Sequence, residues 1–231
     1  MNAAKVTILG IGNVLWADEG FGVRAVEALN RGHVFPGNVT LIDGGTQGIY
    51  LVQHVREADL LLVFDAVDYG LPPGTLKLIE GDAVPKFMGA KKMSLHQTGF
   101  QEVLAMAELL GDYPEHILLV GVQPEELEDY GGSLRPSVRA QIAPAIDAAL
   151  AWLRERGVTV QQRNTPLLAN QGLHPEQLDL ESYETQRPAA QDACRLGDER
   201  ILGDTRMTFD PKPLDLGERP MSVNVDSRRK D

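Results

Sequence analysis

The feature that most constrains the fold is an alternation of short apolar runs and helix-like stripes between residues 5 and 160. The runs are rich in leucine and β-branched residues and end at turn residues, as in strands buried on both faces. Strands that alternate with helices predict an α/β fold: a three-layer, open, mostly parallel twisted sheet flanked by helices. The predicted strands are Lys5–Leu9, Val39–Ile42, Leu60–Phe64, Leu76–Ile79 and Ile117–Val120.

The helix-like stripes place apolar residues three or four positions apart. Pro136 stands near the start of the longest stripe, where proline is pre-organised for a first helical turn. Pro144 lies inside the same stripe, so we expect a kink or a late start of the helix there. The stripes are Phe21, Ala25 and Leu29; Phe100, Val103, Leu104 and Ala107; and Val138, Ile142, Ile146, Leu150 and Leu153.

The composition changes after about residue 160. Residues 161–231 hold six prolines, only two aromatic residues (Tyr183 and Phe209) and no clear period. We therefore predict an α/β domain over residues 1–160 and a poorly ordered, extended C-terminal tail over residues 161–231. The alternative interpretation is that the tail is a docking arm for one partner.

Charge and composition exclude several classes of partner. The formal net charge is −11, which argues against binding to nucleic acid or to an anionic membrane surface. The single cysteine, Cys194, allows neither a disulfide within the chain nor a thiolate metal cluster. No basic, apolar leader stands at the N-terminus and no run reaches the roughly 18 apolar residues of a membrane span. We expect a cytoplasmic protein with no membrane contact.

Acidic residues and one histidine stand at the ends of the apolar runs. Asp18 and Glu19 follow the first strand, Asp65 follows the third, and His96 precedes a helix predicted to begin near Gln97. The carboxyl ends of parallel strands meet at the edge where open α/β sheets bind ligands. Two carboxylates and an imidazole at this edge suit a borderline divalent metal such as nickel or zinc.

Each of these residues also has a simpler interpretation. Asp18 is a suitable helix N-cap, and the helix dipole favours acidic residues in a first turn. A lone histidine such as His96 is more often a surface or packed residue than a ligand. The segment Asp43–Thr46 follows the second strand and reads as a turn, with Thr46 capping the next helix.

The sequence argues against a dinucleotide-binding site and against the common hydrolase motifs. Gly10-Ile11-Gly12-Asn13 follows the first strand, but the third glycine of a dinucleotide fingerprint falls on Leu15, and the acidic pair after it would repel a pyrophosphate. The two glycines then serve a tight turn with close backbone approach. Residues 1–160 also lack a nucleophile-elbow serine, an H-E-x-x-H helix and a Walker loop, which argues against a nucleophilic hydrolase or a classical zinc protease.

Five segments together resemble the [NiFe]-hydrogenase maturation endopeptidases. In order they are GIGNVLWADEGFGVRAVEAL, LIDGGTQG, LLLVFDAVD, SLHQTGFQEVL and LLVGVQPEELE, and the resemblance covers about residues 4–160. The fourth segment is most similar to the branch that serves membrane-bound uptake hydrogenases. The tail has no counterpart in this resemblance.

The resemblance implies an endopeptidase that removes the C-terminal peptide of the hydrogenase large-subunit precursor after nickel insertion. The family's metal-contacting positions fall on Glu19, Asp65 and His96, and an aspartate tied to activity falls on Asp43. Nickel supplied by the substrate would then polarise the scissile carbonyl and activate water. Alternatively, the three ligands only recognise nickel and Asp43 performs aspartyl-type acid–base work. A nickel-sensing maturation chaperone that binds the large subunit without cleaving it is the competing function, and a nucleotide-dependent enzyme is a third class.

Overall fold

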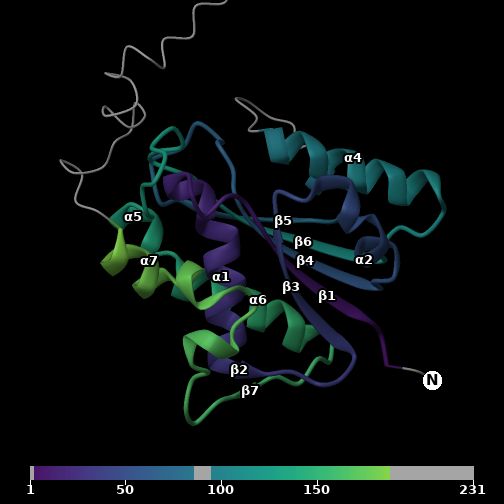
Figure 1. The fold of residues 1–231 in the computed structure, drawn as a ribbon. Helices are drawn as coiled ribbons and strands as arrows, with labels where there is room; N and C mark the ends of the chain where they lie inside the picture. Colours follow the sequence, from purple (N-terminus) through teal and green to yellow (C-terminus); the bar gives the residue numbers. More distant parts are fainter. Residues whose placement is uncertain (1–2, 86–94, 188–231) are drawn as a thin grey trace, which may run out of the picture. The chain divides into compact units, whose positions relative to one another are not determined.

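The computed structural model describes residues 3–85 and 95–187, with the backbone alone for residues 95–99. The chain divides into two compact units, Met1–Arg187 and Pro188–Asp231. Within the described ranges, no helix combines the length and the apolar character needed to cross a bilayer. One sheet and the helices that cover it form the core of the described structure (Figure 1).

The central sheet has five strands in the order β3-β1-β4-β6-β5. Strands β3, β1, β4 and β6 run parallel to one another, and β5 runs antiparallel to β6 at one edge. The five strands predicted from sequence are confirmed, as is the mostly parallel α/β fold. Their bounds are β1 (Val6–Ile11), β3 (Val39–Gly45), β4 (Leu60–Ala66), β5 (Leu76–Glu80) and β6 (His116–Val122).

Helices cover both faces of the sheet, which gives the three layers (Figure 1). On one face lie α1 (Phe21–Gly32) and α6 (Ile142–Glu155), and on the other lie α2 (Val52–Arg56) and α4 (Leu95–Leu109). Short 3-10 helices occur between these elements, namely η1 (Ala17–Gly20), η2 (Gly48–Leu51) and η3 (Gly81–Ala83), and also beyond them, namely η4 (Ala169–Gln171) and η5 (Glu176–Leu178).

Successive residues of the central strands enter two separate cores. Ile8 and Leu62 are fully buried against α1 and α6, whereas Leu9 and Val63 are fully buried against α2 and α4. Alternation of side chains along a strand sends neighbours to opposite faces. Because helices cover both faces, the strands need apolar residues at every position, which explains the continuous runs in the sequence.

The longest predicted stripe forms two helices. A short helix, α5 (Pro136–Arg139), begins with Pro136 at its first turn, and α6 starts afresh at Ile142. Pro144 is the third residue of α6, where the backbone N–H would have no partner within the helix. The late start expected at Pro144 is therefore confirmed, and no kink is needed.

The first compact unit extends beyond the boundary predicted at residue 160. Residues 161–187, here called the C-terminal segment, belong to this unit, and the segment's first strand pairs with a two-residue strand after α1. This arrangement differs from the predicted poorly ordered tail, while residues 188–231 lie outside the described part of the chain. The remaining elements are β2 (His33–Val34), β7 (Gln161–Gln162) and α7 (Leu180–Gln186).

Candidate active site

The carboxyl end of β1 is the point where the chain changes direction across the sheet. From β1 the chain crosses to β3 on one side, and from β3 it returns past β1 to β4 on the other side. Such a switch point is where open α/β sheets bind ligands. Asp43 pairs with Gly10 in register, and Asp65 lies one residue beyond Phe64, which pairs with the same glycine. Two of the predicted carboxylates therefore flank the loop after β1.

Glycines shape the loop that carries the third carboxylate. Gly12 has a φ of 133°, and a Cβ there would lie 1.8 Å from the carbonyl oxygen of Glu19. A Cβ on Gly22 would lie 2.2 Å from the carbonyl oxygens of Ile11 and Phe64. These contacts confirm the sequence interpretation that glycine serves close backbone approach here. Ala17, directly before the acidic pair, has a φ of 40°, a strained value for a residue with a Cβ.

Glu19 and Asp65 both lie in surroundings that exclude much of the water. Glu19 is half-buried in η1, and burial raises the pKa of its carboxyl to about 7. Asp65 is fully buried at the end of β4. Burial, and then the charge of Asp65, raises the pKa of Tyr69, whose ring lies 5.1 Å from the Lys77 ammonium. A carboxyl with a perturbed pKa at a switch point, such as that of Glu19, is a candidate for chemistry.

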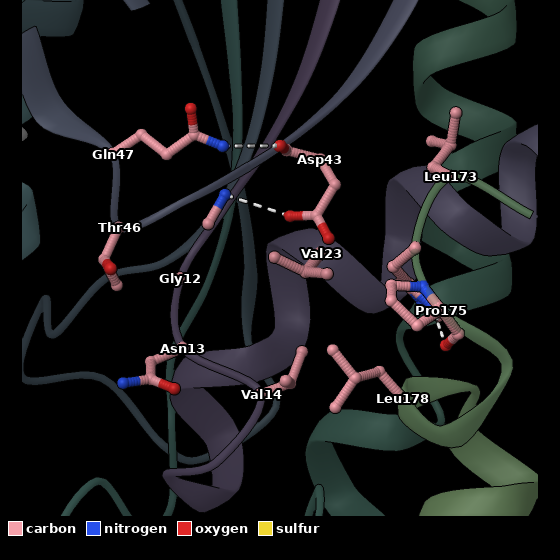
Figure 2. Close-up of a pocket in the computed structure, with 12 residues that line it drawn as sticks. Gly12, Asn13, Val14, Val23, Asp43, Thr46, Gln47, Leu173, Pro175 and Leu178 are labelled. Carbon is pink, nitrogen blue, oxygen red and sulfur yellow. Dashed lines mark hydrogen bonds between the residues drawn. The ribbon is translucent and has the colours of Figure 1, made fainter. Parts of the chain in front are cut away.

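Asp43 lines a pocket of about 360 Å³ on the β3 side of the β1 loop (Figure 2). Its Oδ1 accepts a hydrogen bond from the Gly45 N–H at 3.0 Å, and its backbone carbonyl accepts one from Gln47 Nε2 at 3.5 Å. Burial raises the pKa of Asp43, while the charge of His174, the Gly45 N–H and the charge of Arg24 act in the opposite direction. Asp43 and Gly45 lie within β3, so the turn predicted for this segment begins only at Thr46, and no side chain caps the helix η2 that follows.

Asp18 has a different role from its neighbour Glu19. Its side chain is fully buried and does not cap η1. Instead, its Oδ2 accepts hydrogen bonds from the backbone N–H groups of Glu125 and Glu126 at 2.9 and 2.8 Å, and its Oδ1 accepts one from Arg135 at 2.7 Å. The N-cap interpretation of Asp18 is therefore wrong, because this carboxylate fixes the loop between β6 and α5.

The helix α4 begins at Leu95, two residues before the predicted start at Gln97, so His96 lies in its first turn. Its side chain is outside the described structure, so the metal site of Glu19, Asp65 and His96 stays a prediction. Among the side chains that the structure does describe, no cluster of three or more His, Cys, Asp or Glu residues is placed to hold a metal ion. The donor set of two carboxylates and one imidazole remains suitable for nickel.

The pocket contains a residue that sequence reasoning missed. His174 comes from the C-terminal segment, is only 9 % exposed and lines the same pocket as Asp43. Figure 2 shows its neighbours Leu173 and Pro175 across the pocket from Asp43. An isolated histidine in a stretch without periodicity gives no signal of such a position, and long-range contacts alone bring it there.

Known proteins match both the sequence and the fold. A family model described as hydrogenase maturation protease matches residues 23–152. The hydrogenase expression/formation protein HupD of Thiocapsa roseopersicina is 63 % identical over 198 residues, which are 86 % of this chain and 90 % of that protein. A 198-residue span of this chain necessarily includes His174, so the C-terminal segment has a counterpart in that relative.

A solved structure supports the same assignment. The hydrogenase maturating endopeptidase HybD from Escherichia coli superposes with a TM-score of 0.66 at 39 % identity, covering 69 % of this chain and 98 % of that one. The hydrogenase 2 maturation protease of Escherichia coli is 41 % identical over 155 residues, 67 % of this chain and 93 % of that protein. The chain thus belongs to the hydrogenase maturation proteases, a family of endopeptidases that hydrolyse peptide bonds.

Proposed function

We propose that this endopeptidase removes the C-terminal peptide of a [NiFe]-hydrogenase large-subunit precursor once nickel has been inserted. The observation that supports this most is the gathering of carboxylates around the end of β1, with Asp65 fully buried and the pKa of Glu19 raised to about 7. The names of the relatives favour this hydrolytic function over a chaperone that binds without cutting. The acidic chain gives no reason to propose nucleic acid as a partner. We place the reaction in the cytoplasm.

Nickel enters this proposal as cargo of the substrate, held additionally by Glu19, Asp65 and His96. A carboxylate must be deprotonated to bind a metal, and the pKa of Glu19 near 7 makes that step easy to reverse. A modest site without thiolate would bind little free metal. An ion already bound by the precursor would instead place the scissile segment against the enzyme and lower the entropic cost of attack.

Asp43 is the residue that we assign to acid–base work. Its raised pKa brings the carboxyl closer to the pH at which it can both accept and return a proton. In this role the Asp43 carboxylate takes a proton from water as the water oxygen attacks the scissile carbonyl carbon. When the carbon–nitrogen bond breaks, the same proton goes to the leaving amine.

The test is to incubate nickel-loaded precursor with the wild-type protein and with Asp65→Asn, His96→Ala and Asp43→Asn variants, and to measure the precursor's mass. We expect the wild type to release a C-terminal peptide, and each variant to lose at least about 100-fold in rate while remaining folded. Cys194→Ser is the control and should process normally. A wild-type protein that binds the precursor tightly without a mass loss would contradict the proposal and support the chaperone.

A further inference from the structure

The C-terminal segment is held on α1 by buried charged side chains. Arg24, which is 4 % exposed, donates a hydrogen bond to the carbonyl of Leu178. Glu27, which is 5 % exposed, accepts one from the Leu173 N–H at 2.8 Å through Oε2. Charged groups are expensive to bury unless they are hydrogen-bonded. These bonds therefore fix the path of the chain between residues 173 and 178.

A third anchor follows directly. Arg31, one turn further along α1, forms an ion pair of 2.5 Å with Asp179 and donates to the Leu167 carbonyl at 3.0 Å. Asp179 is itself buried and caps α7 by accepting from the Glu181 N–H at 3.1 Å. Contacts on both sides of residue 174 thus determine its position more firmly than apolar packing alone would.

The residue held between these anchors is His174. Its Nδ1 lies 3.2 Å from the Pro175 carbonyl oxygen, and its Nε2 is buried without a hydrogen-bond partner among the described residues. Buried polar atoms are normally satisfied, so an exception indicates a group available to a ligand or to a proton. The pocket that His174 shares with Asp43 is where such an exchange can occur.

His174 also acts on Asp43 electrostatically. When its imidazole is protonated, its charge favours the Asp43 carboxylate and lowers the pKa that burial raises. Arg24 acts in the same direction more weakly. The other charged or titratable groups packed around this pair and around Arg24 are Glu27 from α1 and Asp179, Tyr183 and Glu184 from the C-terminal segment.

We propose that His174 is a positioning residue for Asp43, which keeps the carboxylate ionised in their shared pocket. The C-terminal segment is then part of the active site. This inference rests on the proposed acid–base role of Asp43. It adds that a histidine far from Asp43 in the chain controls the protonation state in which Asp43 meets the substrate.

The direct test follows the Asp43 carboxyl carbon by NMR as a function of pH in the full-length protein without substrate. In the wild type, its titration should show a second inflection at the pH where the His174 ring titrates. In His174→Asn, which keeps a polar atom near the Pro175 carbonyl but carries no charge, the carboxyl should titrate at higher pH. His33→Asn is the matched control, since His33 Nδ1 lies 3.1 Å from the Leu29 carbonyl oxygen and His33 does not line the pocket.

Processing rates give the second readout. The rate of His174→Asn should fall progressively below that of the wild type as the pH is lowered, whereas a purely structural defect would lower the rate equally at every pH. The inference would be overturned if the Asp43 titration showed no second inflection in the wild type and did not change in His174→Asn. If His174→Asn does not fold, the wild-type titration alone decides. Normal processing by Asp43→Asn would instead refute the proposed role of Asp43, whatever the NMR result.

Discussion

At the scale of single residues, two adjacent carboxylates differ because their surroundings differ. Asp18 accepts three backbone N–H bonds and fixes a loop. Glu19 is half-buried, and burial disfavours its charged form. The sequence places both at the start of a helix and cannot separate them, because the partners of Asp18 lie more than 100 residues away. The raised pKa of Glu19 is of the kind that is typical of functional carboxyls.

Replacing Glu19 by glutamine should stabilise the protein at high pH. The carboxyl has a pKa of about 7 in the folded chain and an ordinary value of 4.5. Between these values the unfolded chain releases a proton that the folded chain keeps, so the wild type loses stability as the pH rises through this window. Glu19→Gln has no such loss. We expect a gain on the order of 1 kcal/mol at pH 8, a small value because the carboxyl is only half-buried.

Denaturant unfolding at pH 5 and pH 8 checks this expectation. The advantage of Glu19→Gln over the wild type should grow between the two values, while the exposed Glu102→Gln on α4 should behave as the wild type at both. A gain that is the same at pH 5 and pH 8, or a loss at pH 8, would show that desolvation does not dominate at Glu19.

At the scale of elements, the predictable parts are those whose pattern is local. The runs around Ile8 and Leu62 predict strands because helices cover both faces of the sheet. The C-terminal segment is held by Arg24, Glu27 and Arg31 of α1, and these contacts span more than 130 residues of sequence. Its elements are also too short to show a period. Glu19, Asp43 and Asp65 each follow a predicted strand, so the sequence could place them at one edge of the sheet. No local pattern could place His174 there.

The boundary of the folded unit gives a prediction for two truncations. A chain that ends at Arg187 keeps the whole first unit and should melt within about 2 °C of the full-length protein, a shift that corresponds to less than 1 kcal/mol. A chain that ends at Val160 loses the packing of Leu173 on the core of α1 and α6, and it should melt several degrees lower.

Thermal unfolding followed by circular dichroism distinguishes the two truncations, with the full-length protein as reference. If they melt at the same temperature, the C-terminal segment adds nothing to the stability of the unit, and the boundary predicted near residue 160 is the better description. The chain that ends at Arg187 should also process the precursor, because it contains the proposed site residues and His174.

At the scale of the whole molecule, the site is built from two parts of the chain: the loops at one edge of the sheet and the C-terminal segment. The switch in strand order around β1 gathers Asp43, Asp65 and the loop of Glu19 at one edge of the sheet. The C-terminal segment then covers α1 and completes the pocket on the Asp43 side. Asp65 and the pocket lined by Asp43 therefore lie on the two sides of the loop after β1.

The role of substrate-borne nickel is tested by the mass of the large-subunit precursor after incubation with the wild-type protein, without added free metal. Metal-free and nickel-loaded precursors are compared at equal concentration. We expect loss of the C-terminal peptide from the nickel-loaded precursor alone, because an ion carried by the substrate would complete the proposed site of Glu19, Asp65 and His96. Equal cleavage of both precursors would contradict this expectation.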